Sequence, residues 1–268
     1  MKSIRTQKGF TLVELAIVMT IIGLLIGGIL KGQELMENAR VTSTVAQVKS
    51  YEAAVTTFRD TFNAMPGDMP LARDRIAGCT DACNAAAATA GNSIVGLQAW
   101  AADWSAQMTA PLNNAAPTTA EGETQLFWTH LLKADLIAGV TDIPLRTGGV
   151  LAWGESHPAA RIGGGFVVGN GNGAIELGST GAAGTGVTGL VLMIQQAVAT
   201  DPDITAGTQP MTPARAAQID RRIDDGRPNS GYIRGYGTQL SCYNTAADTR
   251  YAEAVTSKDC GLVLRIQG

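Results

Sequence analysis

The first pattern along the chain is a long apolar run close to the N-terminus. Residues 10–30, FTLVELAIVMTIIGLLIGGIL, contain one ionisable side chain, that of Glu14. At about 1.5 Å of rise per residue, a helix over this run spans roughly 30 Å, which is the thickness of a bilayer core. The run therefore predicts a transmembrane helix.

The helical pattern continues beyond this run, but with one apolar face. From Lys31 to about Phe62 there is no proline, and the one glycine is Gly32. Apolar residues recur at spacings of three and four, which is typical of a helix with one buried face. These residues are Val41, Val45, Val48, Tyr51, Val55, Phe58 and Phe62. The polar residues of the opposite face are Gln47, Lys49, Glu52, Arg59 and Asp60. We predict one helix from Thr11 to about Thr61, followed by a turn at Met65-Pro66-Gly67-Asp68.

Shorter helices are expected after this turn. Residues 75–125 are rich in Ala, Asn and Thr and contain a short predicted helix, 98–108, with Trp100 and Trp104 one turn apart. A stronger pattern covers 125–137, where we expect His130 to lie at the surface or at an edge. Further helices are predicted over 190–199 and 212–225, the latter with Thr212 as N-cap and Gly226 as stop.

Glycine is abundant in the second half of the chain and limits the amount of helix there. The 32 glycines cluster late, so helix cannot dominate there. Short apolar or alternating segments between Gly and Asn turns are strand candidates. They cover 150–153, 165–168, 174–177, 232–236 and 261–266. The pattern predicts an α+β fold, in which a long N-terminal helix packs on an antiparallel sheet with inserted short helices.

Charge sets the orientation of the membrane segment. Three cations, Lys2, Arg5 and Lys8, precede the apolar run in a tail too short to hold a domain, which keeps the N-terminus cytoplasmic. The formal net charge of -3 gives no electrostatic case for nucleic-acid binding. Glu14 argues against a plain signal peptide or anchor, because a carboxylate within the hydrocarbon costs roughly 2.5–3.5 kcal/mol.

The segment from Lys8 to Leu15, KGFTLVEL, resembles the processing site of type IV prepilins and type II secretion pseudopilins. The resemblance covers about the first 30 residues. It implies that a membrane peptidase and methyltransferase cuts between Gly9 and Phe10 and then methylates the amine of Phe10. It also implies that Glu14 pairs with the Phe10 amine of a neighbouring subunit and so sets the register of a filament.

The resemblance gives the chain a pilin-like organisation. The expected parts are a basic leader (1–9), the transmembrane half of the helix (10–30), its amphipathic half (31–62) and an exported α+β domain (63–268). The implied function is a structural subunit of a pilus or secretion pseudopilus, and the large domain favours a minor pilin or pseudopilin. The expected location is the inner membrane and then the filament. Implied partners are other pilin subunits, an inner-membrane assembly platform and membrane lipid.

A second function remains open at this point. A membrane-anchored periplasmic binding or enzymatic domain would use the same anchor. Unlike a filament subunit, it would need neither cleavage nor Glu14.

The four cysteines fall in two local pairs, Cys79 with Cys83 and Cys242 with Cys260. An even count in an exported domain fits disulfides, and a metal site at Cys79 lacks a second Cys or His cluster. The connectivity stays open from the sequence. The resemblance favours the second pair, because pilins commonly carry a C-terminal disulfide loop.

Other motifs give weak indications of chemistry. Residues 184–189, GTGVTG, match G-x-G-x-x-G before a predicted helix but lack a preceding strand. Ser156-His157 has no nucleophile-elbow pattern. Asp220, Asp224 and Asp225 would suit calcium, but the interleaved arginines favour a salt-bridged helix, and these are Arg221, Arg222 and Arg227. We therefore expect no cofactor, with calcium as the alternative, and no enzymatic activity.

Overall fold

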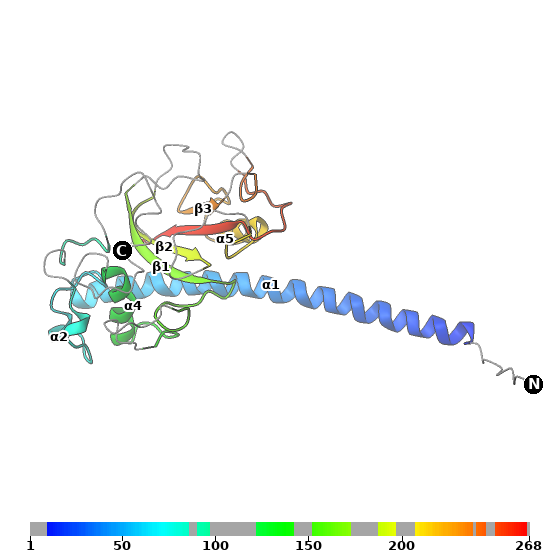
Figure 1. Ribbon diagram of the computed structural model, residues 1–268, viewed down its shortest axis with the longest axis horizontal. Coiled ribbons are helices and arrows are strands. Elements are labelled where there is room, and N and C mark those ends of the chain that lie inside the picture. The colour runs from blue at the N-terminus through cyan, green and yellow to red at the C-terminus, as the bar shows by residue number, and fades with distance from the viewer. Residues whose placement is uncertain are drawn as a thin grey trace, which may run out of the picture. The chain divides into compact units, whose positions relative to one another are not determined.

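Figure 1 shows the computed structural model of the chain. It describes residues 10–85, 90–96, 122–141, 152–172, 187–196, 207–237, 240–244 and 250–266. The chain divides into two compact units, Met1–Arg40 and Val41–Gly268, which are described separately below.

The long helix α1 covers Leu12–Phe62, which confirms the predicted bounds to within one residue. In the second unit one face of the helix is buried, at Val41, Thr44, Val48, Tyr51, Ala54, Val55 and Phe58, while Val45 and Phe62 of the predicted stripe are partly buried. Two residues assigned to the polar face also contact the domain. The amide of Gln47 bonds the backbone of Ala159 and Arg161, and Glu52 accepts a hydrogen bond from the hydroxyl of Tyr232.

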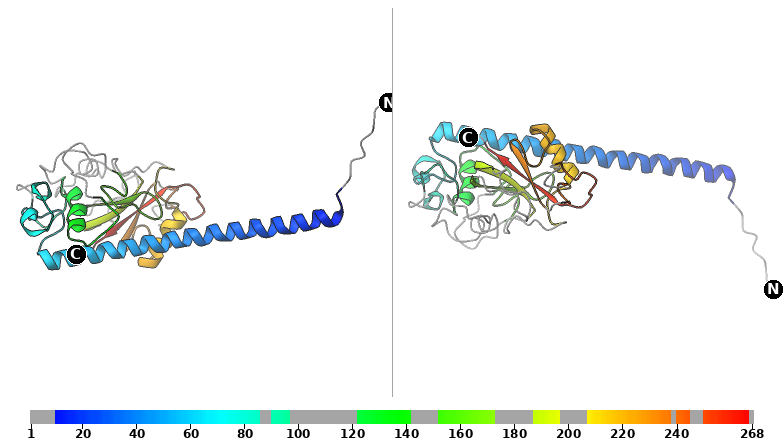
Figure 2. Two further views of the ribbon diagram at one scale, coloured as in Figure 1. Left: turned by 90° about the horizontal axis from the view of Figure 1, so that it is seen from below. Right: turned by 90° about the horizontal axis from the view of Figure 1, so that it is seen from above.

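The sheet of the second unit has four antiparallel strands in the order β1-β2-β4-β3. Their bounds are β1 Gly165–Asn172, β2 Thr188–Gln195, β3 Ile233–Gly237 and β4 Cys260–Arg265. In both views of Figure 2 the sheet lies alongside residues 41–62 of α1. The α+β prediction is thus confirmed, with the C-terminal strand β4 in the middle of the sheet.

The main core lies between α1 and one face of this sheet. Alternate strand residues point into it, as period-two geometry requires, and they include Phe166, Leu192, Ile194, Leu262 and Leu264. The ring of Tyr51 meets Trp128 and Phe166 edge-on, with centroid distances of 5.2 and 5.1 Å. A second apolar cluster includes the residues between these, such as Val167, Met193 and Val263.

Short helices flank this core. They are α2 Ala72–Arg75, the 3₁₀ turn η1 Asp81–Cys83, α4 Glu123–Lys133 and α5 Pro213–Ile223. The helices expected over 125–137 and 212–225 are therefore confirmed, although α4 begins and ends earlier than expected and α5 is slightly shorter. Thr212 occupies the N-cap position of α5, although its side chain makes no capping hydrogen bond.

The helix predicted over 190–199 is wrong, because residues 188–195 form strand β2. This strand pairs with β1 on one side and β4 on the other, and its side chains from Leu190 to Gln195 are buried. A strand covered on both faces is apolar throughout, and periodicity cannot distinguish it from a buried helix.

The expectation of a surface position for His130 is also wrong. This side chain is fully buried in α4 and lies parallel to the ring of Phe58, with centroids 6.0 Å apart. Its Nδ1 accepts a hydrogen bond from the backbone N–H of Gly67 at 2.8 Å, and its Nε2 lies 2.7 Å from the carbonyl of Cys83. Burial lowers the pKa of His130 to about 4, so the ring is neutral and Nε2 donates to Cys83.

Several predicted segments lie outside the described residues. They are the leader 1–9, the helix over 98–108 with Trp100 and Trp104, and the strand over 174–177. The strand over 150–153 is described from residue 152 on, where Trp153 makes an isolated bridge to His157.

Candidate functional site at the N-terminal helix

The first unit presents an exposed apolar helix. Of the helices in the described part of the chain, α1 is the one long and apolar enough to cross a membrane, judged by length and composition. None of its most apolar stretch is buried within the chain. Large side chains such as Phe10 and Leu12 are 87% and 90% exposed. Burying such a surface is worth about 25 cal/mol per Å², so the segment favours a lipid or protein environment over water.

Thr11 and Glu14 cap the start of this helix reciprocally. The backbone N–H and the hydroxyl of Thr11 both donate to Oε2 of Glu14, at 2.9 and 2.8 Å. The backbone N–H of Glu14 in turn donates to Oγ1 of Thr11 at 3.2 Å. This is a capping box, which satisfies two of the N–H groups that a helix start leaves unpaired.

The capping box assigns Glu14 a partner inside its own chain. The prediction for Glu14 considered a neighbouring subunit and missed Thr11, although the spacing Thr-x-x-Glu in the sequence is the signature of this cap. Phe10 precedes α1 and is exposed, and Gly9 lies outside the described residues. The predicted scissile bond thus lies just before the helix begins.

Four glycines in the apolar part of α1 leave its surface open. A Cβ atom added at Gly23, Gly27, Gly28 or Gly32 would meet no atom of the described chain within 4 Å. These glycines therefore do not accommodate contacts within the chain. Small residues on an apolar helix allow the backbone of another helix to come close.

Both predicted cysteine pairs are disulfides in the structure. Cys79 is joined to Cys83 and Cys242 to Cys260, with Cα–Cα distances of 5.7 and 5.0 Å. Both separations lie within the usual range for a disulfide. The second bridge links the loop at 240–244 to the first residue of β4, so it holds a central strand of the sheet.

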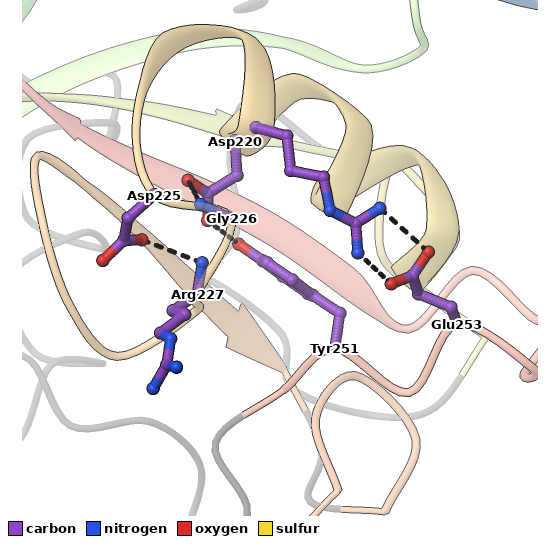
Figure 3. A network of polar contacts seen from close by, with 7 residues as sticks. Asp220, Asp225, Gly226, Arg227, Tyr251 and Glu253 are labelled. Atoms are coloured by element: carbon purple, nitrogen blue, oxygen red, sulfur yellow. Dashed lines mark hydrogen bonds and ion pairs between the residues drawn. The ribbon is translucent and has the colours of Figure 1, made fainter.

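The acidic cluster at the end of α5 acts mainly through hydrogen bonds (Figure 3). One carboxylate oxygen each of Asp220, Asp224 and Asp225 lie within 4.8 Å of one another. Asp220 accepts hydrogen bonds from the N–H of Gly226 at 3.0 Å and the hydroxyl of Tyr251 at 2.8 Å. Asp225 accepts one from the backbone N–H of Arg227 at 2.9 Å.

The predicted salt bridges between this cluster and its arginines are wrong in their partners. Arg221 pairs with Glu253, and Arg222 donates to the hydroxyl of Thr42. Asp224 accepts hydrogen bonds from the backbone of Tyr232 and Ile233. The acids thus organise the turn between α5 and β3. The expectation of no cofactor, with calcium as the alternative, stays a prediction.

The other two motifs are structural where they are described. Ser156 Oγ lies 3.0 Å from Nδ1 of His157, but the same hydroxyl also bonds the backbone of Ala152 within a tight turn. Burial lowers the pKa of His157 to about 3, so this ring is a poor general base. In the glycine motif, the segment after Gly189 is strand rather than the helix that dinucleotide binding requires.

One comparison with known protein families gives a match. Residues 4–30 match the model of the prokaryotic N-terminal methylation motif, which is the prepilin-type cleavage and methylation signal. The match includes Gly9, Phe10 and Glu14. No curated protein and no solved structure matches the chain.

Proposed function

We propose that this chain, which carries the prepilin-type cleavage and methylation signal, is a structural subunit of a type IV pilus or a type II secretion pseudopilus. The match over residues 4–30 is the observation that carries the proposal. The exposed apolar half of α1 supports it, because a membrane and then a filament core would each cover that surface.

Processing would convert the chain into an assembly-competent subunit. Cleavage after Gly9 removes Lys2, Arg5 and Lys8, which changes the formal charge from -3 to -6 before the new amine is counted. The new amine at Phe10, methylated by the peptidase and methyltransferase, remains cationic at the membrane edge. Cleavage thus creates one new positive charge, and this charge lies four residues before Glu14 in the chain.

The capping box is compatible with a partner for Glu14 in another subunit. Thr11 engages Oε2, and no described residue bonds Oε1. The amine of a neighbouring Phe10 would pair with Oε1 while the helix cap stays intact. A subunit out of register would leave this charge unpaired among apolar side chains, which typically costs about 3–5 kcal/mol. Glu14 would therefore set the register of the filament.

The rest of the proposal concerns the exported domain. The compact unit Val41–Gly268, with several inserted helices, favours a minor pilin or a pseudopilin. Other pilin subunits and an inner-membrane assembly platform would be its partners. The role is structural rather than enzymatic, and the buried neutral rings of His130 and His157 agree with this.

Replacement of Glu14 tests the proposal. We expect Glu14→Ala to insert into the membrane and be processed but to yield no filaments or secretion, because the register contact is lost. A matched control is Glu34→Ala, which removes an exposed acid of α1 outside the apolar run and should assemble normally. Filament yield and processing are measured by electron microscopy and mass spectrometry.

Normal filaments or secretion with Glu14→Ala would reject the role of Glu14. If the wild-type chain inserts but remains uncut and unassembled beside an active peptidase, the anchored periplasmic domain becomes the better explanation.

A further inference from the structure

A polar groove lies at the C-terminal end of α1, far along the chain from the methylation signal. Its volume is about 680 Å³, within the range of small-ligand sites. One wall is the last part of α1, with Thr56, Arg59 and Asp60, and the residue that follows the helix, Asn63. The other wall comes from the ends of three strands, with Asn170 of β1, Leu190 of β2 and Arg265 of β4.

The groove is held in shape by hydrogen bonds that use none of its charged groups. Ser93, on its rim, donates its backbone N–H to Oδ2 of buried Asp68 at 2.6 Å. The N–H of Ile266 donates to the carbonyl of Leu190 at 2.8 Å, which fixes the strand ends. The walls are thus formed before any ligand enters, and this lowers the entropy cost of binding.

Two arginines line this groove without a partner. Among the described residues, no hydrogen bond or ion pair engages the guanidinium of Arg59 or that of Arg265. The one acid of the lining is Asp60, so the groove carries a net positive charge in a chain whose formal net charge is -3.

Helix electrostatics explain only part of this arrangement. Arg59 lies in the last turn of α1, where a cation is favoured by the helix dipole. Arg265 belongs to the sheet and has no such reason to face the groove. Two arginines from separate elements line the same groove as Asn63 and Asn170, and together these side chains offer the kind of N–H donors that bind oxyanions.

We propose that this groove binds a small oxyanion ligand, carrying a carboxylate or a phosphate group, through Arg59 and Arg265. Each guanidinium offers a planar fork of N–H donors to two oxygens of the anion. The side-chain amides of Asn63 and Asn170 would form hydrogen bonds with hydroxyl or carbonyl groups of the same ligand. The proposal goes beyond filament assembly and does not depend on it.

Binding is tested on the full chain in neutral detergent at low salt, by calorimetric titration with citrate and, separately, inorganic phosphate. We expect saturable binding of at least one anion. Arg59→Gln and Arg265→Gln should each weaken it about tenfold, since a hydrogen bond to a charged group is worth about that factor. Asp60→Asn should tighten it about two- to fivefold by removing a repulsive charge.

The control is Arg227→Gln, which removes an exposed arginine outside the groove and should bind as the wild type does. Binding of citrate alone identifies a carboxylate ligand, and binding of phosphate alone a phosphate ligand. The proposal is overturned if neither anion binds saturably up to about 10 mM. It is equally overturned if the two groove variants bind like the wild type, or if Arg227→Gln weakens binding as much as they do.

Discussion

Asp220 is a buried carboxylate at the end of α5 that faces two further acids, Asp224 and Asp225. Burial raises its pKa to about 7, and repulsion by Asp225 and Asp224 adds to this, against the hydrogen bonds from Tyr251 and Gly226. Among the described residues, Arg221 interacts electrostatically with Asp220, and Arg234 interacts with all three acids, while burial lowers the pKa of Arg234. The folded chain therefore holds a proton at Asp220 more tightly than the unfolded chain does.

This difference gives the stability a defined pH dependence. Asp220 stabilises the fold fully below its ordinary pKa of 3.8, and this contribution is lost as the pH rises through about 7. After allowance for solvent screening, we expect the full chain in detergent to lose on the order of 1–2 kcal/mol between pH 5 and pH 8. That loss is about 3–6 °C in Tm.

Asp220→Asn should flatten this part of the pH profile, because an amide does not titrate. Asp81→Asn, which replaces an exposed acid far from α5 in sequence, should leave the profile unchanged. Thermal unfolding at half-unit pH steps measures both. An Asp220→Asn profile as steep as that of the wild type would show that another group titrates.

The sequence allowed prediction of residues whose role depends on local spacing. The family model matches the motif around Gly9, Phe10 and Glu14, whereas the roles assigned to these three residues stay predictions. The cysteine pairs could be predicted from their proximity along the chain. The buried positions of His130 and Asp220 could not be predicted from the sequence, because long-range packing decides them. His130 is buried where the turn at Gly67, the carbonyl of Cys83 and the ring of Phe58 meet α4.

At the scale of elements, His130 connects three parts of the fold: α4, the turn after α1 and the 3₁₀ turn η1. The turn approaches α4 so closely that a Cβ at Gly67 would lie 2.3 Å from the carbonyl of Glu123, and Gly67 has a φ of +91°. Only glycine suits this position, and the imidazole of His130 bonds its N–H.

His130→Phe keeps a ring on Phe58 but leaves the N–H of Gly67 and the carbonyl of Cys83 unpaired. Each such buried group costs about 1–3 kcal/mol, so we expect a loss of about 2–5 kcal/mol in the free energy of unfolding. Thr129→Ala, a partly exposed neighbour on α4, should change it by less than about 0.5 kcal/mol. Denaturant unfolding of the full chain compares the two. Equal midpoints for His130→Phe and the wild type would disprove the connecting role.

The elements differ in how far the sequence determines them. The bounds of α1 were predictable because a long apolar run and a three-four repeat leave no other interpretation. Strand β2 could not be predicted, because its run of apolar residues suits a central strand as well as a helix. The pairing of β2 with β1 and β4 decides between these, and such pairing cannot be deduced from local pattern.

For the whole molecule, the two halves of α1 suit two environments. Residues up to Arg40 expose apolar side chains, and from Val41 onward the same helix buries one face in a folded domain. A chain built this way fits a membrane-anchored protein, and its methylation signal implies processing by a prepilin peptidase. We propose that a cut before Phe10 then yields a filament subunit.

Intact-mass and N-terminal fragment spectrometry of the chain, purified from cells with an active prepilin peptidase, will show whether this cut takes place. We predict a mature chain that begins with N-methylphenylalanine at Phe10 and lacks residues 1–9. A chain that still begins at Met1 in those cells would show that the cut does not take place, and would reject the proposed filament subunit.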